Sequence, residues 1–215
     1  MPLNICEIFY SLQGESTFSG VPCVFVRLTG CNLNCTWCDT LYAKKEGTLM
    51  EIKEIIKKVR IFGCGLVEIT GGEPLIQKET SLLIDQLLNL EYQVLVETNG
   101  SIAIDTISAR CIRIVDIKCP SSGESSKNLL RNIDLLGDND EIKFVIADRT
   151  DYEFAKNLII NTKLRKINTL RIHLSPVYGK IQPETLASWI LNDRLGARLS
   201  MQLHKLIWHP DKRGV

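Results

Sequence analysis

The sequence has no long apolar run, no excess of either charge and only three histidines. None of its hydrophobic stretches approaches the roughly 18 residues that a membrane-spanning helix needs. The 26 basic and 25 acidic residues leave a formal net charge of +1. We therefore expect neither a nucleic acid nor a membrane surface as a partner, because both attract strongly charged proteins. Low-complexity tracts and recognisable repeats are missing as well.

The N-terminal stretch MPLNICEIFYSLQGE lacks the basic segment and the apolar run of a signal peptide. The chain nevertheless contains eight cysteines. Without a secretory signal, a cysteine cluster is more often a metal site than a set of disulfides, because cytosolic thiols are kept reduced. We expect a cytoplasmic protein that binds a metal through cysteine.

Strand-like and helix-like segments alternate along the 215 residues, which is typical of a mostly parallel sheet covered by helices. The length and the 45% of hydrophobic residues favour one domain, residues 1–215, with a core that needs no disulfides. Strands are expected at residues 22–29, 66–70, 92–98, 111–118, 141–147, 170–175 and 198–204. Helices are expected at 50–62, around Leu83, Leu87 and Leu90, and near 126–136, 151–161 and 183–194. An open sheet and a curled, incomplete barrel fit this pattern equally well.

Polar or cysteine-containing segments follow most of the expected strands. They are the cysteine loop 31–38, GGEP (71–74), ETNG (97–100), DIKCPSSGE (116–124), SPVYG (175–179) and the pair His204-Lys205. Because the carboxyl ends of parallel strands meet at one edge of a sheet, we expect these segments to converge on one cleft.

The segment GCNLNCTWCDT (30–40) holds Cys31, Cys35 and Cys38 on one short loop. A structural zinc site normally has four protein ligands, whereas a [4Fe–4S] cluster held by three cysteines keeps one iron free for a small molecule. From the spacing alone, zinc with Cys23 or a histidine as fourth ligand stays open. The other cysteines lie in apolar context and are expected to be buried: Cys6, Cys23, Cys64, Cys111 and Cys119.

The C-x3-C-x2-C spacing, with Trp37 before the last cysteine and TGGEP (70–74) after the next strand, resembles the radical S-adenosylmethionine superfamily. The resemblance implies a partial, incomplete (β/α)6 TIM-like barrel. It also implies a [4Fe–4S] cluster whose free iron chelates the methionine end of S-adenosylmethionine, and whose reduction yields a 5′-deoxyadenosyl radical.

Further motifs resemble one family of that superfamily, the 7-carboxy-7-deazaguanine synthases. They are IFYSLQGEST (8–17), Arg27, CDT (38–40), QLHKLIW (202–208) and RGV (213–215). The resemblance runs from Ile8 to Val215 and is weakest between 120 and 165. It implies a carbon–nitrogen lyase that contracts 6-carboxy-5,6,7,8-tetrahydropterin to 7-carboxy-7-deazaguanine with loss of ammonia. That product serves the biosynthesis of queuosine, a tRNA modification.

The same resemblance assigns roles position by position. Cluster ligands are Cys31, Cys35 and Cys38, with Thr40 at the Mg²⁺ position and no catalytic residue beyond the cluster ligands. Substrate contacts are implied for Leu12, Gln13, Gly14, Glu15, Arg27, Thr70, His204 and the terminal carboxylate of Val215. Cofactor contacts are implied for Trp37, Cys38, Asp39, Gly72, Lys118, Cys119, Pro120, Ser175, Pro176, Val177 and Tyr178. Arg27, inside an apolar strand, is either a snorkelling edge residue or, as the resemblance suggests, a bidentate partner for the substrate carboxylate. An amide and a carboxylate suit the guanidine-like edge of the pterin that the resemblance implies.

Two other functions stay open. A radical activase, which forms a glycyl radical on a partner protein, shares the cysteine loop, although SLQGE and QLHK are not expected in it. A non-catalytic zinc or iron–sulfur protein is the second alternative. As partners we expect the pterin, an electron donor such as flavodoxin or ferredoxin, and a second copy of the chain in a homodimer that covers an open sheet edge.

Overall fold

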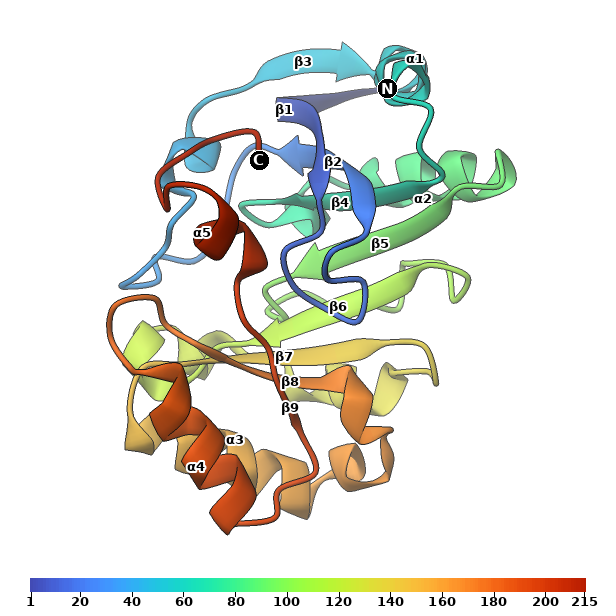
Figure 1. The fold of residues 1–215 in the computed structure, drawn as a ribbon. Helices are drawn as coiled ribbons and strands as arrows, with labels where there is room; N and C mark the ends of the chain where they lie inside the picture. The colour runs from blue at the N-terminus through green and yellow to red at the C-terminus, as the bar shows by residue number, and fades with distance from the viewer.

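The computed structural model describes residues 1–215 and is built on one sheet of nine strands, in the order β3-β1-β2-β4-β5-β6-β7-β8-β9 (Figure 1). From β2 to β9 every pairing is parallel, whereas β1 pairs antiparallel with both β2 and β3. The strands are β1 (Pro2–Leu12), β2 (Pro22–Leu28), β3 (Thr48–Glu51), β4 (Leu66–Gly71), β5 (Gln93–Thr98), β6 (Ile112–Ile117), β7 (Glu141–Ile146), β8 (Ile172–Pro176) and β9 (Arg198–Leu199).

Four longer helices connect the parallel strands: α1 (Ile52–Ile61), α2 (Thr80–Asn89), α3 (Arg149–Asn161) and α4 (Pro183–Asn192). The connection from β5 to β6 contains no helix, and the one from β6 to β7 contains only the 3-10 turns η3 (Pro120–Ser122), η4 (Ser125–Lys127) and η5 (Leu130–Leu135). A helical layer therefore covers only part of the sheet. None of these helices combines the length and hydrophobicity that a membrane span requires.

Local sequence accounts for most of these elements. In α1 the side chains of Ile52, Ile55 and Val59 are buried on one face while lysines occupy the other, which is the pattern of a helix packed on a core. The parallel strand β4 is buried along nearly all its length, as expected for a strand covered on both faces. One core of 36 buried residues extends from β1 to α4 and joins the helices to the sheet.

The N-terminal strands β1 and β3 are absent from the sequence prediction. In β1 the alternation of buried and exposed residues is interrupted by a shift of register between Ile5 and Glu7, so that Cys6 is an extra residue opposite β2. A bulge of this kind re-aims the side chains around it. Here it sets Glu7 opposite Arg27 across the β1–β2 ladder.

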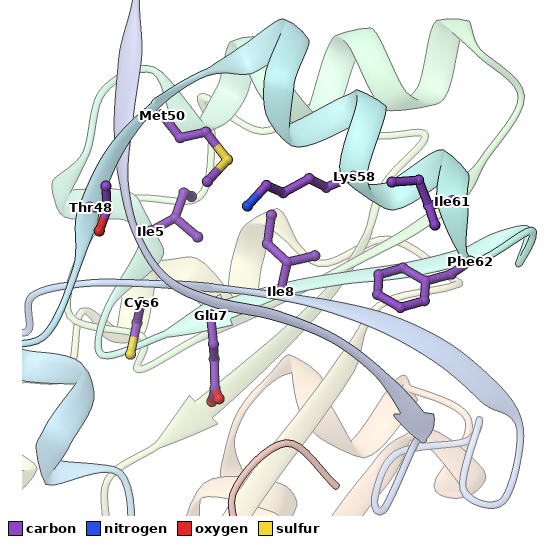
Figure 2. Close-up of a pocket in the computed structure, with 9 residues that line it drawn as sticks. All are labelled: Ile5, Cys6, Glu7, Ile8, Thr48, Met50, Lys58, Ile61 and Phe62. Carbon is purple, nitrogen blue, oxygen red and sulfur yellow. The ribbon is translucent and has the colours of Figure 1, made fainter.

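A groove of about 330 Å³ lies between β1, β3 and α1 (Figure 2). Its walls include Ile5, Ile8, Met50, Ile61 and Phe62. No residue that we expected to bind the cluster, the cofactor or the substrate lines it. The chemistry predicted from the sequence therefore belongs elsewhere, at the carboxyl edge of the parallel strands.

Three local predictions are wrong. The strand expected at 198–204 ends after Leu199, and Leu203–Ile207 form the short helix α5 because Leu203 N donates to the carbonyl of Gly14 (2.8 Å) and turns the chain away from the sheet. The helix expected near 126–136 is a series of 3-10 turns, since the Asn132 amide bonds to the Ile102 carbonyl (2.8 Å) and competes with regular helix. Leu90, expected on the buried face of α2, caps that helix and is 41% exposed.

Candidate active site

The GGEP segment after β4 packs directly on the backbone that leads into the cysteine loop. Gly71 has a φ of 152°, and a Cβ there would overlap the Leu28 carbonyl oxygen. A Cβ on Gly72 would overlap the Gly30 carbonyl oxygen and lie 2.8 Å from the Cβ of Cys31. Glycine is required at both positions because the two loops approach more closely than a side chain allows.

Glu73 ties this segment to the loop after β5. Its fully buried carboxylate accepts hydrogen bonds from Leu75 N (3.0 Å), Thr98 Oγ1 (2.9 Å) and Asn99 N (2.6 Å). Burial raises the pKa of Glu73, and these three donors oppose that rise by stabilising the ionised form. Asn99 in turn donates its side-chain amide towards Cys31 Sγ (3.8 Å). The loops after β2, β4 and β5 therefore form one connected unit.

The loop after β6 closes the other side of the cysteine loop. Thr36 donates from its hydroxyl to the Ser121 carbonyl (2.8 Å), and the Glu124 side chain accepts from Asn34 N (2.7 Å). The ammonium of Lys118 is bonded to Asp116 (2.8 Å). The predicted convergence of strand-end loops is thus confirmed for the segments that follow β2, β4, β5 and β6.

The thiols of Cys31, Cys35 and Cys38 are all partly exposed and unbridged. Burial raises the pKa of the Cys35 thiol. The Lys118 ammonium opposes that rise, whereas the Asp116 carboxylate and the other two thiols of the loop increase it. No group of three or more cysteine, histidine or acidic side chains is arranged to hold a single metal ion. Cys23, one candidate for the fourth ligand of a zinc site, lies buried at the opposite end of β2 from the cysteine loop.

A cluster of carboxylates with one lysine lies beside the β1–β2 loop. Glu15 forms an ion pair with Lys143, which also lies 2.9 Å from Glu97 Oε1. Gln202 donates to Glu15 (2.8 Å), and the Gln13 side-chain oxygen accepts from Glu15 N (2.7 Å). Burial raises the pKa of Glu15, but the Lys143 ammonium and the Gln202 amide outweigh it, so the pKa falls below its ordinary value. Glu15 is therefore held as a carboxylate, with Gln13 beside it.

Arg27 lies at the other side of this region, in a chain of contacts that reaches the C-terminus. Its Nε donates to Glu7 (2.7 Å), and the Tyr42 hydroxyl donates to the same carboxylate oxygen (2.8 Å). The Arg213 guanidinium lies over the Tyr42 ring at 3.6 Å and donates to Glu46 (2.9 Å). The terminal amino groups of Arg27 have no partner in the chain, which leaves them as the donors for an anionic ligand.

The sequence-predicted substrate residues lie near these two groups. His204 belongs to the short C-terminal helix α5, which Figure 1 shows. A Cβ on Gly14 would overlap its Nδ1, so α5 packs closely on the β1–β2 loop. Burial lowers the pKa of His204, opposed by the Glu15 carboxylate. Thr70 is buried in β4 directly beside Arg27 on β2. Leu12 ends β1, and Val215 is half-buried.

The predicted cofactor and metal residues fall into two groups. At the cysteine loop, Trp37 is half-buried, Lys205 pairs with Asp39 (2.6 Å), and Thr40 Oγ1 lies 4.0 Å from Cys38 Sγ. At the ends of β6 and β8 lie the others: Lys118, Cys119, Pro120, Ser175, Pro176, Val177 and Tyr178.

Two of those side chains are buried within the chain. Cys119 is 1% exposed within the core, and Ser175 donates its hydroxyl to the Ser200 carbonyl (2.8 Å). A ligand can therefore reach only the backbone of these residues. Pro176 and Val177 are buried as well, whereas Tyr178 is 56% exposed.

Several polar residues of the site were not predicted from the sequence: Glu7, Glu97, Asn99, Lys143 and Gln202. For Lys143 a signal was present, because a lysine inside the apolar strand EIKFVIA is as unusual as Arg27 in its own strand. Asn99 and Glu97 carried a weaker signal, since ETNG follows a strand.

Known proteins match both the cysteine region and the whole chain. Residues 25–116 match the model of the radical SAM superfamily. A 7-carboxy-7-deazaguanine synthase of Chlorobaculum tepidum is 46% identical over 217 residues, which cover 100% of this chain and 98% of that relative. The chain belongs to the 7-carboxy-7-deazaguanine synthase family. A second 7-carboxy-7-deazaguanine synthase, of Koribacter versatilis, is 43% identical over 99% of this chain and all of the relative.

The fold agrees with this membership. The crystal structure of QueE from Escherichia coli superposes with a TM-score of 0.77 and 26% identity, and the match covers 95% of each chain. The predicted partial barrel of the radical SAM type is thus confirmed. Membership excludes the zinc protein and disfavours the activase, because the full-length relatives are synthases.

The superfamily's [4Fe–4S] cluster and S-adenosylmethionine fit the residues present. Three unbridged, partly exposed thiols stand on one loop, which is the donor set that a three-cysteine cluster needs. The backbone of Gly71 and Gly72 packs against Leu28 and Gly30, so the GGEP segment lies directly beside that loop. Cys31, Cys35 and Cys38 are therefore the residues that would hold the cluster.

Proposed function

We propose that the chain converts 6-carboxy-5,6,7,8-tetrahydropterin to 7-carboxy-7-deazaguanine and ammonia, for queuosine biosynthesis. The observation that carries this proposal is the 46% identity to a 7-carboxy-7-deazaguanine synthase over the entire chain. It is supported by carboxylate, amide and guanidinium groups gathered beside the cysteine loop. When bound, the reduced cluster and S-adenosylmethionine supply the radical that begins the reaction.

The residues of this chain bind and orient the substrate. Glu15 offers a carboxylate to the donor groups of the pterin edge. The Gln13 side chain accepts from Glu15 N and donates to Glu68, so Gln13 would meet the pterin through its backbone or by giving up one of these bonds. The free amino groups of Arg27 suit the substrate carboxylate, while Glu7 fixes the guanidinium through Nε. His204 and the carboxylate of Val215 would meet the substrate from the C-terminal segment. Orientation of this kind accelerates a reaction by removing the entropy cost of alignment.

We propose the same assignments for the remaining predicted contacts. Thr40, which precedes a 3-10 turn and has Asp39 Oδ1 at 3.4 Å, would place a hydroxyl towards Mg²⁺, a cation that keeps several water or substrate ligands. Gly72 and the strand ends 118–120 and 175–178 would contact S-adenosylmethionine, through backbone at Cys119 and Ser175. A flavodoxin or ferredoxin as electron donor, a homodimer and a cytoplasmic location complete the proposal.

Anaerobic reconstitution tests the function. The chain is loaded with iron and sulfide, and then receives reductant, S-adenosylmethionine, Mg²⁺ and the carboxy-tetrahydropterin. Mass spectrometry should detect 7-carboxy-7-deazaguanine, and a Cys31→Ala, Cys35→Ala, Cys38→Ala triple variant should form none. Cofactor cleavage to 5′-deoxyadenosine without conversion of the pterin would overturn the proposed substrate.

A further inference from the structure

Lys143 is the cation that pairs directly with both Glu15 and Glu97. It lies on β7, and its side chain is only 11% exposed. Its ammonium forms an ion pair with Glu15 and lies 2.9 Å from Glu97 Oε1. Glu15 comes from the β1–β2 loop and Glu97 from the end of β5, so the lysine joins two elements that have no backbone pairing with each other.

The surroundings of Lys143 are strongly acidic. Glu68 on β4 is 2% exposed, and Asp116 on β6 is buried beside Lys118. Burial raises the pKa of Glu68 well above its ordinary value, and the nearby carboxylates of Glu97 and Glu15 raise it further. The surroundings therefore favour the protonated form of Glu68, whereas contact with the lysine favours the ionised form of Glu15. The difference between these two carboxyl groups follows from which of them pairs with the ammonium.

We propose that Lys143 is a positioning residue for the pterin: its ammonium holds Glu15 and Glu97 together as a rigid pair of carboxylates at the substrate-binding side of the site. This inference rests on the proposed function, because Glu15 is the group expected to meet the pterin. An ionised, fixed carboxylate accepts hydrogen bonds from the N–H groups of the pterin edge, whereas a protonated one presents a donor instead. Lys143 itself need not touch the substrate.

The charges around the pair fix the sign of the expected pH effect. Burial raises the pKa of Glu97 and Lys143 opposes that rise, so both carboxyl groups depend on the same ammonium. Burial lowers the pKa of Lys143, but Glu15, Glu97 and Asp116 outweigh it and raise it well above its ordinary value. The lysine therefore stays charged throughout the working pH range. His204, on α5, is the other basic side chain that faces Glu15, and Arg27 faces Glu68.

Removal of the ammonium should raise the pKa of both Glu15 and Glu97, because two neighbouring buried carboxylates without a counter-charge take up a proton. In Lys143→Met the pH below which pterin affinity is lost should rise by about one unit, and the Kd for pterin at pH 7 should rise on the order of 30-fold. Lys143→Arg keeps the charge and should remain within about 5-fold of wild type. Lys57→Met, on the exposed face of α1, is the matched control for loss of a lysine.

The experiment measures Kd for the carboxy-tetrahydropterin by fluorescence quenching between pH 5.5 and 8.5, on reconstituted enzyme with S-adenosylmethionine, alongside KM, kcat and the circular dichroism of each variant. Three results together support the proposal. Lys143→Met folds but has a raised Kd, its loss of pterin affinity at low pH begins at a higher pH than in wild type, and the double variant Lys143→Met, Glu97→Gln partly recovers. A Lys143→Met enzyme with unchanged Kd and pH profile overturns it. So does an equal loss in Lys143→Arg and Lys143→Met, which would mark the position as purely structural.

Failure of the proposed function gives a different result. If the wild-type chain binds no carboxy-tetrahydropterin at any pH, the substrate assignment is wrong before any variant is compared. Wild-type conversion of the pterin with no effect of Lys143→Met contradicts the role of the lysine alone.

Discussion

Asn99 Nδ2 and Cys31 Sγ lie 3.8 Å apart, although 68 residues separate them in the chain. The contact exists because Glu73 binds Asn99 N at 2.6 Å and so draws the loop after β5 onto the cysteine loop. A buried glutamate of the GGEP segment thereby organises the surroundings of the thiols that we propose as cluster ligands. The predictions below test this organisation, the stability of the buried Glu141–His173 pair and the contacts that hold the C-terminal segment beside Glu7 and Arg27.

Glu73→Ala should lower the free energy of unfolding by about 3 kcal/mol, because it leaves the donors of Leu75, Thr98 and Asn99 without a buried acceptor. Glu73→Gln keeps one acceptor oxygen and should lose less. Urea denaturation of the two variants and wild type, all without iron, measures the difference. An alanine variant as stable as wild type would show that water replaces the carboxylate at no cost.

Gly72→Ala should prevent stable loading of the cluster, since the added methyl group would overlap Gly30 and press on Cys31. Gly65→Ala is the matched control, because nothing lies within 4 Å of a Cβ at that position. Iron and sulfide content after reconstitution is the measurement. Equal iron in both alanine variants would mean that the cysteine loop moves freely away from the GGEP segment.

The buried pair Glu141 and His173 should make stability depend on acidity. Burial raises the pKa of Glu141, but hydrogen bonds from His173 and Thr17 outweigh it, and the pKa falls below its ordinary value of 4.5. A carboxyl group with a depressed pKa contributes stability above its unfolded pKa and loses it as the pH falls through the folded pKa. Wild type should therefore exceed Glu141→Gln by about 1–3 kcal/mol at pH 6, with the difference shrinking below pH 4.5. Urea unfolding from pH 3.5 to 6 measures this, and a difference independent of pH would refute the ionised state of Glu141.

Arg213→Ala should weaken pterin binding without abolishing the reaction. The guanidinium stacks on Tyr42 and bonds to Glu46, and so holds the C-terminal segment beside the Glu7–Arg27 pair. Loss of these contacts should raise KM for the pterin roughly 5-fold and leave kcat nearly unchanged. A factor of that size is what a partly exposed cation–π contact together with an exposed ion pair typically contributes. Lys212→Ala, an exposed neighbour, is the control. A fall in kcat with constant KM would assign the terminus a different task.

Much of this architecture was predictable because local signals and tertiary structure agree. The parallel strands are apolar runs buried on both faces, and the chemistry-bearing loops follow their carboxyl ends. The three cysteines and the glycines of GGEP can also be recognised from the sequence alone, because the motifs they form require particular residue types at fixed spacings.

Other features depend on contacts that no local pattern encodes. RLSMQLH alternates like a strand, but the bond from Leu203 N to the Gly14 carbonyl turns it into α5, and so places His204 at the site. The strand β1 was missed because the bulge at Cys6 interrupts its period of two. The pairing of Lys143 with Glu15 and Glu97 arises only when β5, β7 and the β1–β2 loop are assembled.

The central claim is a ring contraction with loss of ammonia, and its most direct test is the stoichiometry of one reaction. Reconstituted enzyme with reductant, S-adenosylmethionine and Mg²⁺ is given a known amount of carboxy-tetrahydropterin, and pterin, 7-carboxy-7-deazaguanine and ammonia are all quantified. The account predicts one deazaguanine carboxylate and one ammonia for each pterin consumed. Pterin that remains intact while 5′-deoxyadenosine accumulates would contradict it.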